Sequence, residues 1–166
     1  MKPATISQIK KELVHKSPSE LIELCLRLSK FKLENKEMLS YLLFNAANEQ
    51  MYIQAVKEEM SKNFLNINTK SYFYIRKSIR KILRDTKKHI RYSKNKETEV
   101  ELLLYFCSEL KNMSPPITGN LTLQNIFFWQ IALIKKLVSG LHEDLQYDYN
   151  EEIELLQSIS VNFIIS

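Results

Sequence analysis

Glycine is nearly absent from this sequence, with only Gly119 and Gly140 among 166 residues. Proteins contain about 7% glycine on average, because positive φ angles and close backbone approaches favour a residue without a side chain. Loops that cradle phosphate groups and turns that bind dinucleotides need several glycines within a short span. The scarcity therefore excludes P-loop and Rossmann-type proteins, and it leaves these two glycines for the positions that need positive φ.

Cysteine is also rare, and Cys25 and Cys107 stand far apart in apolar surroundings without a CxxC pair. This usage is typical of a reducing compartment and predicts two buried, inert thiols. Long apolar segments are missing too: the longest uninterrupted run is Leu102 to Cys107, and the charged N-terminal sequence lacks the apolar core of a signal peptide. We therefore expect a cytoplasmic protein with no membrane partner.

Recognisable metal and catalytic motifs are missing as well. His15, His89 and His142 fall in separate expected helices, without a second ligand at HxxxH spacing. The one local cluster, His142-Glu143-Asp144, is more typical of a polar helix end than of a metal site. A cysteine nucleophile would need a base beside it, and both cysteines lie on apolar helical faces. We expect no cofactor, no metal and no catalytic residues, and therefore a protein that is not an enzyme.

Helical spacing is what the sequence does show. Apolar residues recur at intervals of three and four along almost the whole chain, and the few prolines and glycines fall between these segments. The pattern predicts an all-α protein of about seven helices in a single helical domain, residues 1–166, since a chain of this length can bury one core. Two architectures stay open, a stack of helical hairpins that resembles an α-solenoid and a compact bundle.

Local signals place the first helix ends. A first helix is expected over residues 6–15, and Ser17-Pro18-Ser19-Glu20 predicts the start of the second, with Ser17 as the cap and Glu20 completing a capping box. Asn35 is expected to cap a third helix, and a break near Asn48 to begin a fourth. The third helix is expected to bury Leu39, Leu42, Leu43 and Ala46.

The second half of the chain has the clearest core candidate. Residues 97–113 are apolar around most of a helix circumference, which predicts a central buried helix. A proline-containing loop over 114–120 precedes a helix over 122–141, in which Trp129 is expected to pack in the core. A last helix is expected from about residue 150, with Glu151 and Glu152 in its first turn.

The strongest single feature is a basic segment. Between Lys70 and Lys96 the chain places eleven Lys and Arg residues against one acid, Asp85, so this stretch carries a formal charge of +10. Subtracting it from the totals of 24 basic and 19 acidic residues leaves 13 bases and 18 acids, so the net charge of +5 conceals a basic element on an acidic remainder. A concentrated patch matters more for binding than the mean charge.

On a helix five of these basic residues form one row at spacings of four, four, three and four, with Lys88 beside it and a stripe of isoleucines on another face. The five residues of the row are Arg76, Arg80, Arg84, Lys87 and Arg91. Like charges at such spacings repel, so the helix needs an anionic partner or strong packing of its apolar stripe. We name as the basic ridge the residues expected to bind an anion or a partner: Arg76, Arg80, Arg84, Lys87, Lys88 and Arg91.

Three interpretations of the basic ridge stay open. The first is that it faces water or acids of this chain, because six acids and no Lys or Arg follow residue 140. The second is contact with nucleic-acid phosphates, to which nearby aromatic residues could add base stacking. The third is an acidic protein or a membrane surface, of which the membrane is the weaker. The aromatic residues expected to stack are Tyr72, Phe73, Tyr74 and Tyr92.

Three segments carry a resemblance to known sequences: SPSELIELCLRLSKFKLENKEMLSYLLF over 17–44, ETEVELLLYFCSELK over 97–111 and LHEDLQYDY over 141–149. They resemble an uncharacterised family of small all-helical bacterial proteins with no known activity. The resemblance implies a bacterial, cytoplasmic setting and supplies no catalytic residues. The hairpin expected in the first segment also resembles HEAT-type repeats.

Taken together, these features favour a non-enzymatic helical interaction module that binds an unknown protein partner or self-associates. The alternative is nucleic-acid binding through the basic helix over residues 70–96. An enzyme of unknown class is the third interpretation.

Overall fold

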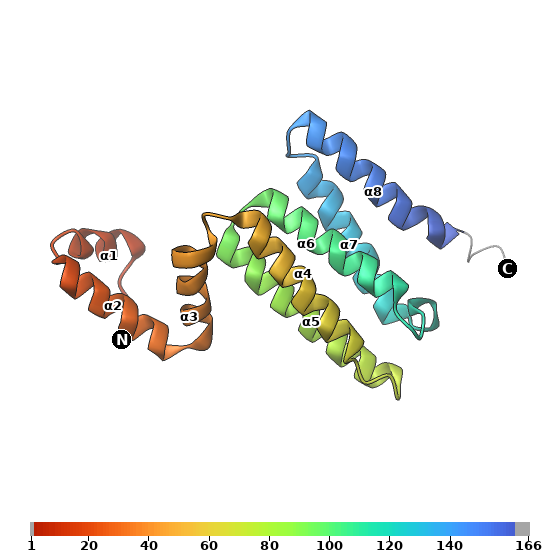
Figure 1. Ribbon diagram of the computed structural model, residues 1–166, viewed down its shortest axis with the longest axis horizontal. Helices are drawn as coiled ribbons and strands as arrows, with labels where there is room; N and C mark the ends of the chain where they lie inside the picture. Colours follow the sequence, from red (N-terminus) through yellow and green to blue (C-terminus); the bar gives the residue numbers. More distant parts are fainter. Residues whose placement is uncertain (1, 162–166) are drawn as a thin grey trace. The chain divides into compact units, whose positions relative to one another are not determined.

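The computed structural model describes residues 2–161, with side chains to residue 158, and shows an all-α protein (Figure 1). Eight α-helices and no strand occur within these residues, which confirms the predicted fold class and the approximate number of helices. The helices are α1 (Ile6–Leu13), α2 (Pro18–Phe31), α3 (Leu33–Ser40), α4 (Glu49–Leu65), α5 (Tyr72–Ser93), α6 (Lys96–Asn112), α7 (Leu121–Val138) and α8 (Glu143–Val161), with a π-helical turn η1 (Tyr41–Asn45) and a 3-10 turn η2 (Ile117–Gly119).

The chain divides into two compact units, residues 1–46 and 47–166. Chain length alone does not predict a boundary at this point. The single helical domain over residues 1–166 therefore stays a prediction. The predicted break near Asn48 is confirmed, since the Asn48 side chain accepts a hydrogen bond from the Met51 N–H, at 3.2 Å, and caps α4.

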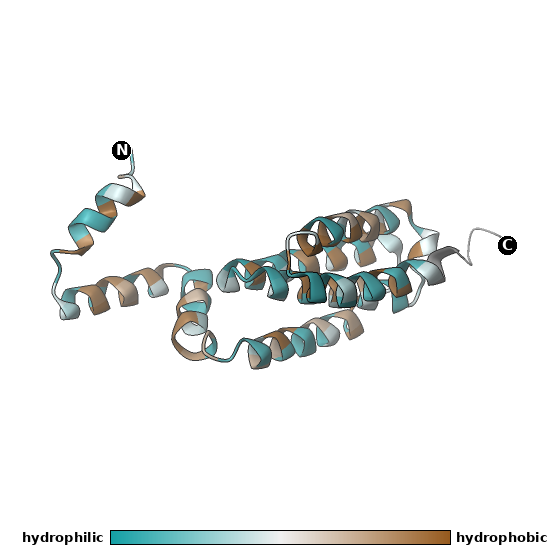
Figure 2. Cartoon of the chain, turned by 90° about the horizontal axis from the view of Figure 1, so that it is seen from above, coloured by the Kyte–Doolittle hydropathy of each residue, from teal (hydrophilic) through white to brown (hydrophobic). Residues whose placement is uncertain are grey.

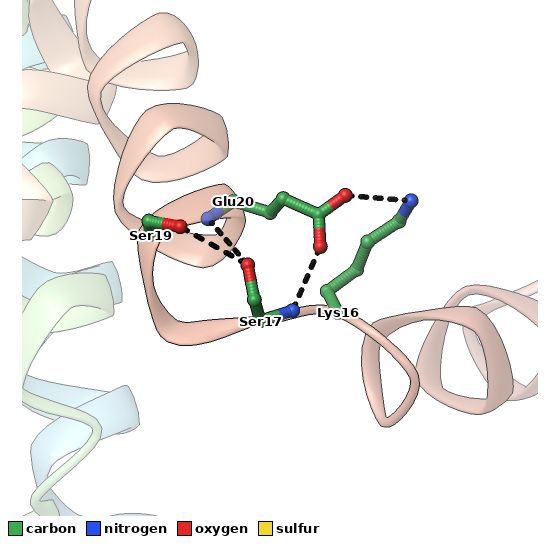
Figure 3. Close-up of polar contacts among 4 residues, drawn as sticks. All are labelled: Lys16, Ser17, Ser19 and Glu20. Atoms are coloured by element: carbon green, nitrogen blue, oxygen red, sulfur yellow. Dashed lines mark hydrogen bonds and ion pairs between the residues drawn. The ribbon is translucent and has the colours of Figure 1, made fainter.

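The junction between α1 and α2 follows the predicted capping box (Figure 3). The Glu20 N–H donates to Ser17 Oγ at 3.3 Å, and the Ser17 N–H donates to the Glu20 carboxylate at 2.8 Å. The hydrogen bond from the Ser17 N–H to the carboxylate is the main reason that the pKa of Glu20 is lowered, and the Ser17 side chain and the ion pair with Lys16 at 3.4 Å add to the effect. The chain therefore turns sharply into α2, with Pro18 in its first turn.

Residues 33–46 depart from the prediction in two ways. The third helix begins at Leu33 without a side-chain cap, and Asn35 instead donates through Nδ2 to the Leu28 carbonyl oxygen at 2.8 Å. The expected core positions Leu42, Leu43 and Ala46 are exposed. Phe44, between them, is exposed as well, so the wrong prediction follows from the lack of a covering layer: Tyr41 is the single buried side chain of residues 2–46.

The second unit is organised around α6, which contacts α4, α5, α7 and α8. Consecutive helices pack against each other from α4 to α8, and α6 also packs beside α4 and α8. The result is one layer of α4, α6 and α8, with α5 and α7 on α6 in a second layer. This is the arrangement of stacked helical hairpins.

The core of this unit confirms the prediction for the central helix. Phe106 and Cys107 of α6 are fully buried, as are Phe127 and Ile134 of α7. Apolar side chains surround α6 on most sides, which is why the segment is apolar around its circumference. The other fully or nearly fully buried positions of α6 are Val100, Leu102, Leu103, Leu104 and Leu110.

The last helix starts earlier than expected, at Glu143, so that Glu143 and Asp144 occupy its first turn in place of Glu151 and Glu152. The sequence over 143–149 is polar and gives no apolar stripe, although acids in this position suit the positive end of the helix dipole. Up to residue 158, the buried side chains that hold α8 on the unit are Tyr149 and Ile153.

Glycine is used differently from the prediction. Neither Gly119 nor Gly140 has positive φ, and the one described residue with positive φ is Lys94, at 56°, where α5 ends in the left-handed conformation. Gly119 serves a close approach instead: a Cβ there would lie 2.1 Å from the Tyr72 hydroxyl oxygen. That hydroxyl donates to the Pro116 carbonyl oxygen at 2.9 Å and ties α5 to the loop before α7.

Candidate functional site

The basic ridge points outward because the apolar stripe of α5 faces inward. Ile75, Ile79 and Ile82 are at most 5% exposed, and Thr86 and Ile90 continue the same face. Arg80, Arg84, Lys87 and Arg91 are exposed on the other side of the helix, and Arg76 and Lys88 are half-buried. The packing of the isoleucines offsets the repulsion within the ridge.

Four residues of the basic ridge form one wall of a groove between α5 and α7, with a volume of about 660 Å³. Thr122, Asn125 and Trp129 of α7 also line this groove, and their spacing of three and four places them on one face of that helix. The groove exists because α5 and α7 both pack on α6. The residues that line it are Arg80, Leu83, Arg84, Lys87 and Arg91 of α5 and Thr122, Asn125, Ile126, Trp129 and Gln130 of α7.

Trp129 contradicts the prediction that it packs in the core, since its side chain is 69% exposed. The helix α7 is apolar on several sides, but only the face with Leu123, Phe127 and Ile134 meets α6 and its neighbours. Trp129 lies two residues beyond Phe127, about 200° around the helix. An exposed indole beside a row of cations is a surface that suits an anionic aromatic ligand.

Gln130 adds an unusual polar group to the groove. Its side chain is 6% exposed, and Oε1 is buried without a hydrogen-bond partner among the residues that the structure describes. Most buried acceptors in folded proteins are paired, and an unpaired one costs about 1–3 kcal/mol. A ligand that donates a hydrogen bond, after a rotation of this amide toward the groove, would recover part of that cost.

The predicted site residues do not all lie in this groove. Arg76 lines a second hollow on the outer surface of α5, together with Phe73, Lys77 and Lys81, while Lys88 lines neither. Among the aromatic residues expected to stack on bases, Phe73 and Tyr74 are exposed, but Tyr92 is buried and Tyr72 bonds to the Pro116 carbonyl. Sequence reasoning missed Trp129 and Gln130, because only the packing of α7 beside α5 gives them a place in the site.

The acids after residue 140 do not lie across the basic ridge. Asp148 and Glu152 of α8 line a different hollow, of about 560 Å³, which they share with Lys57, Glu97 and Glu101. Partial burial raises the pKa of Glu152, with Glu101 and Asp148 adding to the rise and Lys57 opposing it. The Tyr149 hydroxyl donates to Glu97 there at 3.3 Å, and burial is the main reason that its pKa is raised.

The ridge therefore keeps most of its charge unneutralised. Arg84 Nε lies 4.0 Å from Oδ1 of its neighbour Asp85, and 73% of the arginine side chain is exposed. Across residues 2–158, no ion pair joins Arg80, Lys87 or Arg91 to an acid. The first interpretation of the ridge therefore keeps only contact with water for these three cations, because no acid of residues 2–158 pairs with them.

The two cysteines lie in different environments, although both were predicted to be buried. Cys107 is fully buried, which raises the pKa of its thiol to about 12, whereas Cys25 is exposed and contradicts the prediction of two buried thiols. The described part of the chain contains no group of three or more His, Cys, Asp or Glu residues arranged to hold a metal ion. Over the same residues, every helix is too short or too polar to cross a membrane.

Comparisons of the chain with protein-family models, with curated protein sequences and with solved structures found no match.

Proposed function

We propose that this chain is a non-enzymatic helical interaction module whose groove between α5 and α7 binds single-stranded nucleic acid. One observation carries the proposal: four cations line one wall of the groove, and an exposed tryptophan lines the same groove from α7. Cations recognise the phosphate backbone, and an exposed indole recognises the face of an unpaired base.

The cations are spaced for a polymer rather than for a single anion. The four cations follow one another at three or four residues, which is about 4.5–6 Å along the helix axis, and the row from Arg80 to Arg91 is about 17 Å long. A row of this length matches several consecutive phosphates. The arginines also offer planar donor groups that suit phosphate oxygens.

The wall on α7 favours a single strand over a duplex. In a duplex the bases stack on each other, so the face of a base reaches Trp129 only where the strand is unpaired. Asn125 and Gln130 carry side-chain amides that can donate to and accept from the edges of bases. Backbone contacts set the affinity in this proposal, and the amides supply a base preference.

Membership of the uncharacterised bacterial family, a cytoplasmic location and the absence of enzymatic activity stay predictions. An unknown protein partner stays a prediction too. Nucleic acid is favoured because it combines phosphate with an aromatic base, which is the combination that the two walls present.

The test is fluorescence anisotropy of labelled single-stranded DNA and RNA at several salt concentrations. Each phosphate neutralised on a single strand contributes about −0.7 to the slope of log K against log salt, so four cations predict a slope of about −3. Arg80→Glu/Arg84→Glu should weaken binding and reduce the magnitude of this slope. Lys62→Glu/Lys70→Glu is the charge-matched control, since both lysines are exposed and line neither wall.

Binding that is independent of salt, or equally weakened by both double variants, would contradict the proposal. Duplex DNA of the same length is the second comparison, and we expect it to bind more weakly because its bases cannot stack on Trp129.

A further inference from the structure

The first unit exposes an unusual amount of apolar surface. Within residues 2–46 the single buried side chain is Tyr41, and none of the residues of α1, α2 or α3 is buried. Figure 2 shows apolar residues in brown along these N-terminal helices. Contiguous apolar surface on this scale marks an interaction site in a folded protein.

The helix α2 concentrates this surface. At about 100° per residue, its apolar side chains cover more than half of the helix circumference, and α3 packs along only part of that arc. Ile22 and Leu28 are each 61% exposed, Leu26 is 48% exposed and Phe31 is 77% exposed. An amphipathic helix with this much exposed apolar surface is stabilised when a partner covers it.

The charges of α2 indicate which partner fits. Glu20 and Glu23 stand in its first half and Arg27 and Lys30 in its second half, and all four fall within about 80° of one another around the helix. The order along this polar side is acid, acid, base, base. If two copies of α2 lie antiparallel, the acidic half of each copy lies beside the basic half of the other, which is the self-complementary pattern of a two-fold interface.

We propose that α2 pairs antiparallel with α2 of a second copy of this chain. The two copies bury Ile22, Leu26 and their neighbours against each other, and Glu23 of each copy faces Arg27 of the other. Cys25 lies midway between these two positions in the sequence, so it stands at the height of the two-fold axis along α2, on the apolar side of the helix. A membrane surface suits α2 less well, because membrane-surface helices carry mainly Lys and Arg on the polar side, whereas α2 carries equal numbers of acids and bases.

This inference is independent of the proposed function, since α2 belongs to the first unit and the groove to the second. Its test does not use nucleic acid. If the chain dimerises and does not bind oligonucleotides, only the proposed function fails, and if it binds them as a monomer, only this inference fails.

The first experiment is analytical ultracentrifugation of the full chain over a wide concentration range. The unmodified chain should dimerise. Glu23→Arg and Arg27→Glu, tested separately, should each weaken the dimer by about tenfold or more, because each replaces two opposite-charge contacts with two like-charge contacts. Glu20 is left unchanged because its carboxylate completes the capping box with Ser17.

Two further samples make the antiparallel arrangement specific. The double variant Glu23→Arg/Arg27→Glu, and an equimolar mixture of the two single variants, should both regain dimers, since each restores opposite charges in an antiparallel pair. Lys36→Glu in α3 is the control, and we expect it to dimerise like the unmodified chain. Circular dichroism of every variant separates a folding defect from a loss of pairing.

The second experiment uses Cys25 as a probe. A short bismaleimide should join the two copies through Cys25, and Cys25→Ser should abolish this product, because Cys107 is fully buried. A monomeric unmodified chain overturns the inference, whether or not it then binds lipid vesicles through this face. A dimer that both single variants leave intact overturns it too, as does one that the double variant fails to restore.

Discussion

Arg84 of α5 and Trp129 of α7 line the same groove, although they belong to helices that do not follow each other in the chain. The two residues bring together a guanidinium group and an exposed indole, which recognise different parts of a nucleotide. Neither residue alone specifies a ligand. Their position in one groove, with three further cations on α5, is the observation on which the account of function depends.

Replacing Trp129 tests the contribution of base stacking. Trp129→Ala should weaken binding of single-stranded oligonucleotides by about 1–3 kcal/mol, or roughly 5- to 150-fold, and Trp129→Phe should keep part of the affinity. Anisotropy at fixed salt measures both. Because the side chain is 69% exposed, thermal stability should change little, and a large loss of stability in Trp129→Ala would show that the indole is a packing residue.

Replacing Gln130 should separate stability from binding. Gln130→Met removes the buried, unpaired Oε1 while keeping the side-chain length, so the free energy of unfolding should rise by up to about 1–3 kcal/mol while oligonucleotide affinity falls. Urea denaturation and anisotropy are the two measurements. Gln124→Met is the contrast, because Gln124 donates to the Thr118 carbonyl oxygen at 2.9 Å and its loss should lower stability. A destabilised Gln130→Met protein would contradict this explanation.

Lys94 offers a test of backbone strain at the end of α5. Lys94 has a φ angle of 56°, which strains a residue that carries a Cβ. Lys94→Gly relieves this strain in the folded state, but it also gives the unfolded chain more conformational entropy. The net effect should be a stabilisation of about 0.5–1 kcal/mol. Lys94→Ala removes the same charge and keeps a Cβ, so it should bring no such gain. Equal stabilisation by alanine and glycine would assign the effect to charge rather than to φ.

The two thiols should differ in reactivity. Burial raises the pKa of Cys107 to about 12, so at neutral pH this thiol is protonated as well as inaccessible, and only the thiolate is nucleophilic. Native protein treated with iodoacetamide at pH 8 should therefore label at Cys25 alone, as read by mass spectrometry. Labelling of Cys107 should appear only in denaturant, and fast labelling of both thiols in the native state would disprove the core position of Cys107.

Much of the local structure could be predicted from the sequence. Ser17 and Glu20 mark the start of α2 because a capping box is a local hydrogen-bond pattern, and α6 is recognisable because a helix packed on most sides is apolar around its circumference. The outward direction of the basic ridge follows from the spacing of Ile75, Ile79 and Ile82 in the same way.

The groove could not be predicted, because it depends on which helices pack side by side. Trp129 belongs to a helix that is apolar on several sides, and periodicity does not show which of those sides meets the core. The exposed apolar residues of α2 were missed for a related reason. Apolar residues at helical spacing, such as Ile22 and Leu26, predict that one face of the helix is buried. They do not show whether that face packs against the same chain or against a partner.

The most direct test of the proposed function is the fluorescence of Trp129, which is the only tryptophan in the chain. The protein is titrated with an unlabelled single-stranded oligonucleotide at low and at high salt. We predict saturable quenching and protection from acrylamide at low salt, both strongly reduced at high salt and in Arg80→Glu/Arg84→Glu. Tryptophan fluorescence that does not respond to the oligonucleotide at low salt would contradict nucleic-acid binding in this groove.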